Sequence, residues 1–275
     1  MLRAGFVAVV AAGGLALMGS LAALQWPSVL VYSGLVVLLF GWLSVLAPPH
    51  WLGFSRRWHG LLTGILAGGA LFAAGWFWPA GSFTITSPAT RLDAFLPTYN
   101  FHERHEINIQ APPERVRQAL DQVSFADIGV SRTLAAIRGI AMGHWCAAGG
   151  PQGASPAVPM VETIKSRRSG FFPLDDTPRE FVFGLAGKPW NNASVRIKPE
   201  EFRNWASPGS VKAAVNFLIE DAGGGRSRII TETRVAASDD FARSKMAHYW
   251  ALIYPGSGMI RRSLLNAIRE RAERR

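Results

Sequence analysis

The sequence predicts an α+β protein in which an apolar helical anchor precedes one water-soluble domain. Three long uncharged apolar runs lie in the first part of the chain. Beyond them, alternating apolar and polar residues indicate antiparallel strands, and apolar residues at helical spacing near the end indicate a long C-terminal helix. We expect an anchor over residues 1–80, a linker over 81–99 and a soluble domain over 100–275.

Charge is distributed very unevenly along this chain. Although 49% of the residues are hydrophobic, Arg3, Arg56 and Arg57 are the only fully charged residues before position 81. All 19 acidic residues and the other basic residues follow, so the rest of the chain is net basic and long enough for one globular core. The single cysteine, Cys146, excludes an intramolecular disulfide, and its neighbour His144 lacks the further ligands that zinc requires. We therefore expect no metal and no cofactor.

The three apolar runs are long enough to cross a bilayer as helices. They cover residues 4–24, 29–46 and 61–78, and none contains a charged residue. About 20 helical residues span about 30 Å of hydrocarbon, and a helix of a soluble core would show a polar stripe that these runs lack. The first run has an alternative interpretation as a cleaved signal peptide. The short link at 25–28 fits a helical hairpin better.

Basic residues in short loops predict the orientation of the anchor. The loop at 47–59 holds Arg56 and Arg57, whereas the link at 25–28 holds no charge. Placing these arginines and Arg3 in the cytoplasm leaves the C-terminal domain outside. We expect a multi-pass protein of a bacterial inner (cytoplasmic) membrane, with a cytoplasmic N-terminus and a periplasmic domain.

A glycine stripe in the third run predicts close helix packing. Gly60, Gly64 and Gly68 recur every four residues, so they present one smooth face to which another helix can come close. Two partners are open: the other helices of the same chain, or a second copy in a homodimer.

The soluble domain opens with a strand and a helix. Residues 101–110 are expected as the strand, and apolar residues at helical spacing after Pro113 predict the helix. A second helical stretch is expected over 131–140. A loop rich in glycine and proline is expected over 147–159.

Strands dominate the next part of the chain. Residues 171–174 and 180–185 flank a turn sequence, Asp-Asp-Thr-Pro. Alternation over 211–220 predicts a strand with one apolar face, and three glycines at 223–225 turn the chain into its partner strand over 227–235.

The C-terminal segment is expected as two helices. Ser238 can cap the first, which is expected to end near Tyr254 because Pro-Gly-Ser-Gly follows at 255–258. In the last helix the apolar residues fall on one stripe. This stripe consists of Ile260, Leu264, Ile268 and Ala272.

Two segments resemble the START-like, or SRPBCC, superfamily. The stretch from Arg104 to Val116, RHEINIQAPPERV, is similar to its opening strand and first helix. The stretch from Tyr249 to Leu265, YWALIYPGSGMIRRSLL, is similar to a segment of uncharacterised bacterial members. The resemblance covers about residues 100–273, rests mainly on the order of the elements and does not include the anchor. It implies a helix-grip fold, in which a curved antiparallel sheet surrounds the C-terminal helix.

The same resemblance implies a cavity between sheet and helix that often holds an apolar ligand; some members of the superfamily are cyclases or hydrolases. The aromatic and aliphatic residues of the predicted strands and C-terminal helix are the candidates to line it, or simply to fill the core. These candidates are Phe181, Phe183, Trp190, Trp205, Val215, Phe217, Tyr249, Trp250 and Tyr254.

We find no sequence motif for catalysis: there is no G-x-S-x-G, H-E-x-x-H or P-loop pattern. On the first strand, His102 and Glu106 share one face, and Glu103 and His105 share the other. A general base among these four is one interpretation, and a solvated strand edge is the favoured one. For Glu232, a position facing the cavity is one interpretation, and a surface ladder of ion pairs with Arg228 and Arg234 is the favoured one. We predict no catalytic residue.

Arginines crowd the last predicted helix, among them Arg261, Arg262 and Arg269. They are candidates to contact anionic lipid head groups, or they form a solvated helix face. A membrane anchor argues against nucleic acid as the partner.

The sequence therefore predicts a membrane-anchored binding module for a lipid or another apolar small molecule. The alternatives are a cyclase-like or hydrolytic enzyme on an apolar substrate, and a non-catalytic membrane assembly or interaction protein. A core without a cavity would favour the last of these.

Overall fold

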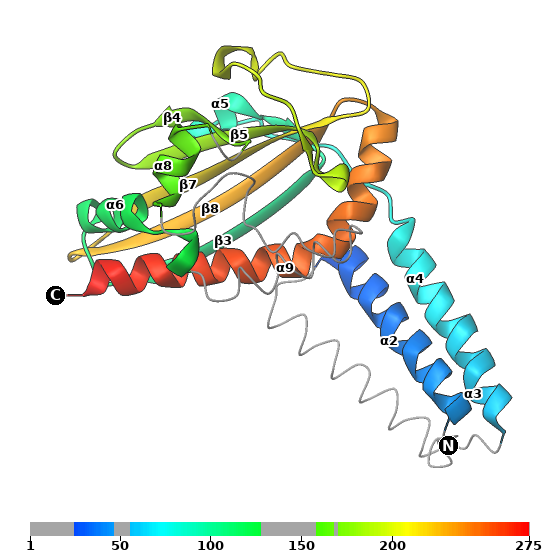
Figure 1. Cartoon of the computed structure of the whole chain (residues 1–275). Coiled ribbons are helices and arrows are strands. Elements are labelled where there is room, and N and C mark those ends of the chain that lie inside the picture. Colours follow the sequence, from blue (N-terminus) through cyan, green and yellow to red (C-terminus); the bar gives the residue numbers. More distant parts are fainter. Residues whose placement is uncertain (1–24, 47–55, 128–157, 168–169, 275) are drawn as a thin grey trace. The chain divides into compact units, whose positions relative to one another are not determined.

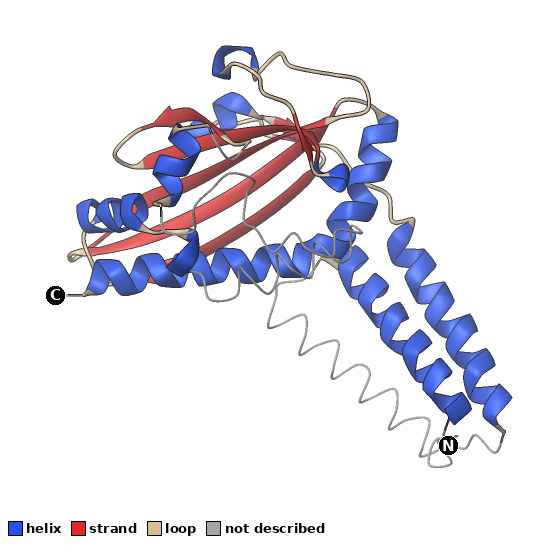
Figure 2. Cartoon of the chain, in the orientation of Figure 1, coloured by secondary structure: helices blue, strands red, loops and turns tan. Residues whose placement is uncertain are grey.

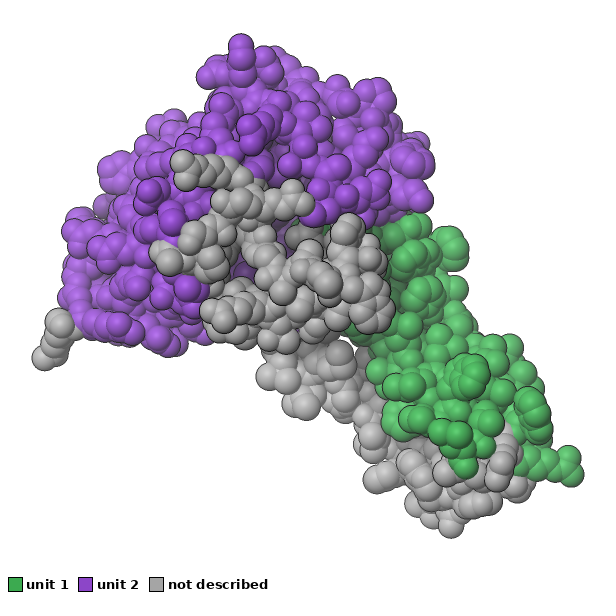
Figure 3. All heavy atoms as spheres, viewed as in Figure 1, with its two compact units in different colours: residues 1–79, 247–255 green, residues 80–246, 256–275 purple. Residues whose placement is uncertain are grey.

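The computed structural model describes residues 25–46, 56–127, 158–167 and 170–274. Helices combine with an antiparallel sheet (Figures 1 and 2), which confirms the α+β class. The chain divides into two compact units (Figure 3). The first comprises 1–79 and 247–255, and the second comprises 80–246 and 256–275.

The first unit contains a pair of apolar helices. Helix α2 covers Trp26–Leu46. The second helix is built from α3 (Arg57–Thr63), the π-helical segment η2 (Gly64–Gly68) and α4 (Gly69–Trp76). The apolar runs at 29–46 and 61–78 are therefore helical, with their boundaries moved toward the N-terminus. Helix α2 includes Pro27 because the first turn of a helix does not need the N–H that proline lacks.

These two helices are long and apolar enough to cross a membrane. The candidate spans are Trp26–Leu46 and Trp58–Trp76, with mean hydropathies of 2.3 and 1.3. In the most apolar stretch of each span, only 28% and 22% of the residues, respectively, are buried. A core helix of a soluble protein would be mostly buried, so water is a poor solvent for these surfaces. The third expected span, at 4–24, lies outside the described residues.

Glycines bring the two apolar helices into backbone contact. A Cβ atom on Gly64 would lie 2.4 Å from the Cα of Gly41, and a Cβ on Gly68 would lie 2.7 Å from the backbone nitrogen of Leu38. Gly60 is buried at the same contact, where its carbonyl oxygen faces Gly41. The expected glycine stripe therefore packs against α2 of the same chain, which leaves that face unavailable to a second copy.

A six-stranded antiparallel sheet forms the centre of the second unit, in the order β3-β8-β7-β5-β4, with β6 paired to β5. Its strands are β3 (Phe101–Ile109), β4 (Phe172–Asp176), β5 (Glu180–Lys188), β6 (Ala193–Ser194), β7 (Val211–Gly223) and β8 (Arg226–Ala237). The predicted β7–β8 hairpin is confirmed, and Gly223, Gly224 and Gly225 all adopt the positive φ that its turn requires.

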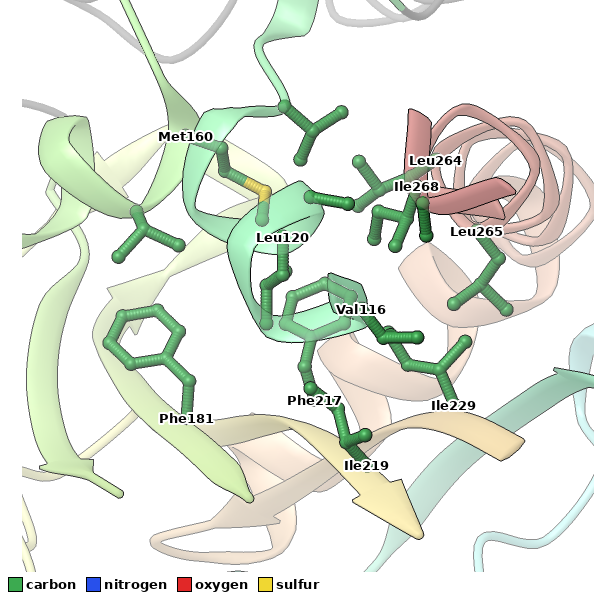
Figure 4. Packing of buried hydrophobic residues seen from close by; sticks show 14 of the residues in the cluster. Val116, Leu120, Met160, Phe181, Phe217, Ile219, Ile229, Leu264, Leu265 and Ile268 are labelled. Atoms are coloured by element: carbon green, nitrogen blue, oxygen red, sulfur yellow. The ribbon is translucent and has the colours of Figure 1, made fainter. Parts of the chain in front are cut away.

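Each face of this sheet is covered by a separate apolar cluster. Helices α6 (Pro113–Gln122), α8 (Met160–Lys165) and α9 (Asp240–Glu273) contribute to the cluster on the inner face. Leu120 of α6 and Leu264, Leu265 and Ile268 of α9 meet Phe181 and Phe217 of the sheet there (Figure 4). Helix α8 was not expected from the sequence. The helix expected at 131–140 lies outside the described residues.

The segment at 81–99, expected to be a linker, belongs to the second unit instead. It forms β1 (Phe83–Thr84), α5 (Arg91–Phe95) and β2 (Thr98–Tyr99). Leu92 and Leu96 are buried against the outer face of the sheet. The carboxylate of Glu180 accepts hydrogen bonds from the backbone nitrogens of Arg91 and Leu92 at the start of α5, at 2.8 and 3.2 Å. Because Glu180 is distant in the sequence, no local pattern predicts that this segment packs on the sheet.

Helix α9 runs without interruption through the expected break at 255–258. Pro255 removes one backbone hydrogen bond, a cost of about 3 kcal/mol. The apolar stripe beyond it contains the buried Leu264 and Ile268, and each fully buried side chain of this kind contributes about 1.5–3 kcal/mol. The stabilisation from burying these side chains therefore outweighs the cost of Pro255. The helix begins after Asp239, whose Oδ1 accepts from the backbone nitrogen of Ala242 at 2.8 Å, and not after Ser238.

We predict that Gly64→Ala destabilises the apolar helix pair by about 1–3 kcal/mol, because a methyl group there overlaps the backbone of α2. Gly69→Ala is the matched control, since nothing lies within 4 Å of its Cβ position. Thermal unfolding of the two variants in detergent measures the difference. Equal melting temperatures would contradict the packing described.

Candidate functional site

A polar cluster is buried on the inner face of the sheet, where α9 crosses β3 and β8. Glu103 is 1% exposed and His105 is 8% exposed. The two residues share one face of β3, as predicted, but the solvated strand edge expected for them is wrong, because residues of α9 cover this face.

Glu103 is the centre of this cluster. Its Oε1 lies 2.8 Å from Nε2 of His105, and its Oε2 accepts a hydrogen bond of 2.6 Å from the hydroxyl of Ser257. Nε of Arg261 lies 3.4 Å from the same Oε2. Nη1 of Arg261 donates to Oγ1 of Thr231 at 3.1 Å, and Thr231 stands opposite His105 in the β3–β8 pair. Two strands and one helix therefore supply the polar groups.

The Gly-Ser-Gly sequence of α9 lies directly against this cluster. A Cβ atom on Gly258 would lie 3.4 Å from Oε1 of Glu103 and 3.5 Å from Cε1 of His105, which is ordinary van der Waals contact. Ser257 beside it directs its hydroxyl to the carboxylate. The residues interpreted as a helix break therefore form the contact surface of a continuous helix.

Electrostatics keep Glu103 ionised despite its burial. Burial alone would raise the pKa of Glu103, because it disfavours the charged form. The hydrogen bond from His105, the positive charge of Arg261 and the hydroxyl of Ser257 outweigh this effect, so the pKa of Glu103 lies below its usual value. The Glu103–Arg261 pair is thus an ion pair shielded from water.

The hydrogen bonds of this cluster favour binding over nucleophilic catalysis. An activated serine donates its proton to a base strong enough to remove it, commonly a histidine. Ser257 donates instead to Glu103, a weak base because its pKa is lowered. Oγ1 of Thr233, opposite Glu103 on β8, is buried with no hydrogen-bond partner among the described atoms. Unused polar groups beside a buried ion pair could orient the polar part of a ligand. Within the described ranges, no three His, Cys, Asp or Glu residues are arranged to hold a metal.

Four of the predicted cavity residues lie together, in the apolar part of the same face. Phe181, Phe183, Val215 and Phe217 are all buried (Figure 4 labels Phe181 and Phe217). The ring of Phe183 lies 5.5 Å from that of Phe181 and 6.1 Å from that of Phe217. These side chains pack against one another and occupy the space between them. Two surface hollows of the described structure are lined by other residues.

The remaining predicted cavity residues lie elsewhere. Trp205 packs against the cluster on the outer face, and Trp190 is half-buried in the short helix η4 (Pro189–Asn191). Tyr249, Trp250 and Tyr254 belong to the first unit with the apolar helices. There Nε1 of Trp250 donates to Oε1 of Gln25 at 3.1 Å. Four of the nine candidates are therefore brought together on the inner face of the sheet.

The charged residues singled out in the sequence also separate. Arg261 belongs to the buried cluster, with a side chain only 16% exposed and directed to Glu103. Arg262 and Arg269 are part-exposed, and contact with a lipid head group stays a prediction for these arginines. Glu232 pairs with Arg234 at 2.6 Å, but Arg234 is buried and also pairs with Asp93 at 2.7 Å. The ion pairs expected in a surface ladder therefore belong partly to a buried network, which lies on the outer face of the sheet.

Sequence reasoning missed Ser257, Thr231 and Thr233. The available signal was the alternation of β3 and β8. Glu103 and His105 share their face with the buried Ile109, and Thr231 and Thr233 share theirs with Ile229 and Val235. Polar residues at alternate positions of an otherwise apolar strand face indicate an interior polar site.

No protein-family model, curated protein or solved structure matches this chain.

We predict that Glu103→Gln lowers the free energy of unfolding by about 3 kcal/mol, because it leaves Arg261 buried without its counter-charge. Glu106→Gln is the matched control on the same strand. Its pair with Arg104 is exposed, so the loss should stay below about 1 kcal/mol. Thermal or denaturant unfolding of both variants measures this. Similar losses in the two variants would rule out the role assigned to Glu103.

Proposed function

We propose that this chain is a membrane-anchored binding module whose soluble unit takes a lipid or another apolar small molecule. The observation that carries the proposal is the composition of the inner face of the sheet. An apolar part built on Phe181 and Phe217 adjoins the buried polar cluster of Glu103, His105, Ser257 and Arg261. An amphipathic molecule requires both kinds of surface.

Anchoring in a bilayer is supported by the exposed apolar side chains of α2 and of the helix formed by α3, η2 and α4. Leu39, Phe40 and Trp42 of α2 are each more than half exposed, and Leu66 of the partner helix is 65% exposed. Neither candidate span contains an acidic residue, and aromatic residues begin α2 and end α4. Hydrocarbon solvates such surfaces at no cost, whereas water does not.

The proposed location is a bacterial inner membrane, with the N-terminus in the cytoplasm and the soluble unit in the periplasm. The support is the position of Arg56 in the loop between the apolar helices, since short basic loops stay in the cytoplasm. A membrane-impermeant maleimide, applied to intact spheroplasts, reports the orientation when Glu200→Cys is introduced and Cys146 is replaced by serine. Labelling only after permeabilisation would reverse it.

A helix-grip assignment to the START-like superfamily is part of this proposal. It is supported by the antiparallel sheet, by its opening strand β3 and by the long helix α9 across its inner face. Fold alone does not choose between binding and catalysis. The choice of binding rests on Ser257, whose hydroxyl is bound to the carboxylate of Glu103, a weak base because its pKa is lowered.

Uptake of a ligand would require the interior to open. The rings of Phe181, Phe183 and Phe217 contact one another, so an apolar chain can enter only if side chains or α9 move. The polar cluster lies where α9 continues past Pro255, the position at which this helix lacks a backbone hydrogen bond. We expect binding to be slow for this reason, with the polar end of the ligand at Arg261.

A non-catalytic membrane assembly or interaction protein is the second candidate function. The specific observation in its favour is the packing of the described inner face, where side chains occupy the space that a ligand would need. A homodimer through the apolar helices would use their outward faces, because the stripe of Gly64 and Gly68 already contacts α2.

Native mass spectrometry of the full chain in mild detergent, with organic extraction of co-purified molecules, tests the proposed binding. We expect a stoichiometric apolar or lipid-like adduct on the wild type. Arg261→Gln should lose most of this adduct, since it removes the buried cation of the cluster. Arg262→Gln, at the adjacent arginine, which is not part of this cluster, should retain it.

A folded wild-type protein with a clean apo mass would contradict ligand binding and favour the assembly function. Circular dichroism and thermal unfolding of both variants confirm that the comparison is made between folded proteins.

A further inference from the structure

A second candidate site lies in the soluble unit, away from the polar cluster. It is a surface hollow of about 330 Å³ between the end of α8, the start of β4 and the segment before η5 (Pro199–Glu201). Its charged lining consists of Arg167, Arg196, Lys198 and Glu201. Three cations and one acid give this hollow a net positive charge.

Arg167 holds an unusual backbone conformation at the edge of the hollow. Its φ is +57°, and it follows the last turn of α8, where its backbone nitrogen donates to the carbonyl of Ile164 at 3.0 Å. Glycine is the usual residue at this place, because a side chain in the left-handed region is disfavoured. The other non-glycine residue described with positive φ is an asparagine, which tolerates it well. An arginine at a position that favours glycine indicates a functional role for its side chain.

The guanidinium of Arg167 is held in place by contacts in which no carboxylate of the described residues takes part. Its Nη2 donates to the carbonyl oxygen of Ile197 at 2.8 Å, and its Cζ lies 5.8 Å from the centre of the Phe172 ring. These contacts position the group and leave its charge uncompensated. Its remaining N–H donors can bind two oxygens of an anion in a fork.

Arg196 and Lys198 add two further uncompensated cations. Both side chains are exposed, and no carboxylate of the described residues lies within ion-pair distance of either. Among the described residues, the side chain of Glu201 accepts only one hydrogen bond, a long one of 3.5 Å from the backbone nitrogen of Lys198. Three cations that line one hollow attract a compact anion with several oxygens. Phe171 and Phe172 in the lining provide an apolar wall beside it.

We propose that this hollow binds a phosphate group, held in a fork by Arg167 and neutralised by Arg196 and Lys198. The phosphate comes from a free phosphate compound or from a lipid head group, whose apolar part would lie against Phe171. The proposal is independent of the ligand site under α9, because the two sites share no residue.

Isothermal titration calorimetry on the full chain in nonionic detergent, at constant ionic strength, tests the proposal. The probes are inorganic phosphate and dihexanoyl phosphatidic acid. We expect saturable binding of at least one probe at one site per chain. Affinity for phosphatidic acid at least about tenfold above that for phosphate would identify a lipid head group, and equal affinities a free phosphate compound.

Substitutions assign the binding to the hollow. Arg196→Gln combined with Lys198→Gln should weaken binding by about tenfold or more, the usual effect of losing a charge-assisted contact. Arg167→Gly should weaken it similarly without lowering the melting temperature, since glycine accepts the positive φ. Lys245→Gln removes an exposed cation outside the hollow and should change affinity less than about twofold.

Two results would overturn the proposal. One is the absence of saturable binding of either probe to the folded wild type. The other is an equal loss of affinity in Lys245→Gln and in the variants of the hollow, which would indicate attraction by net charge alone.

Discussion

Helix α9 must satisfy two different environments, and the rest of the structure depends on how it does so. Its residues 247–255 belong with the apolar helices, where Leu252 accepts a hydrogen bond of 2.7 Å from the hydroxyl of Tyr32. Its residues from 256 onward cover the inner face of the sheet. The buried charge of Glu103 fixes the position of this second part, because the carboxylate needs both Ser257 and Arg261. A shift of α9 along β3 would leave that charge without compensation.

The division of the inner face follows from the same constraint. Where α9 presents Leu264 and Ile268, the sheet presents aromatic rings and the interior is packed. Where α9 presents Ser257, Gly258 and Arg261, the sheet presents acid, imidazole and hydroxyl groups. Packing of the first kind stabilises the unit, whereas buried ions contribute little net stability. The cost of keeping them makes the polar part the better candidate for function.

Much of this fold could be predicted from local patterns. Alternation in β7 with its glycine turn predicted the hairpin, and the stripe of Leu264 and Ile268 predicted the last part of α9. The predictions that failed depended on distant partners. Pro255 was expected to end the helix, because the residues that bury the helix beyond it lie on other elements. The segment of Leu92 was expected to be a linker, because the residue that anchors it, Glu180, is distant in the sequence. At the site, Glu103 and His105 were seen as a pair. Their burial under Ser257 and Arg261 required the tertiary structure.

The central claim is that the apolar helices place this protein in a bilayer. Alkaline carbonate extraction of membranes from cells that express the full chain tests it most directly, because carbonate strips peripheral proteins and leaves those that cross the hydrocarbon. The exposed apolar surface of the spans Trp26–Leu46 and Trp58–Trp76 predicts that the chain stays in the membrane pellet and is released only by detergent. Recovery of folded protein in the carbonate supernatant would contradict the account.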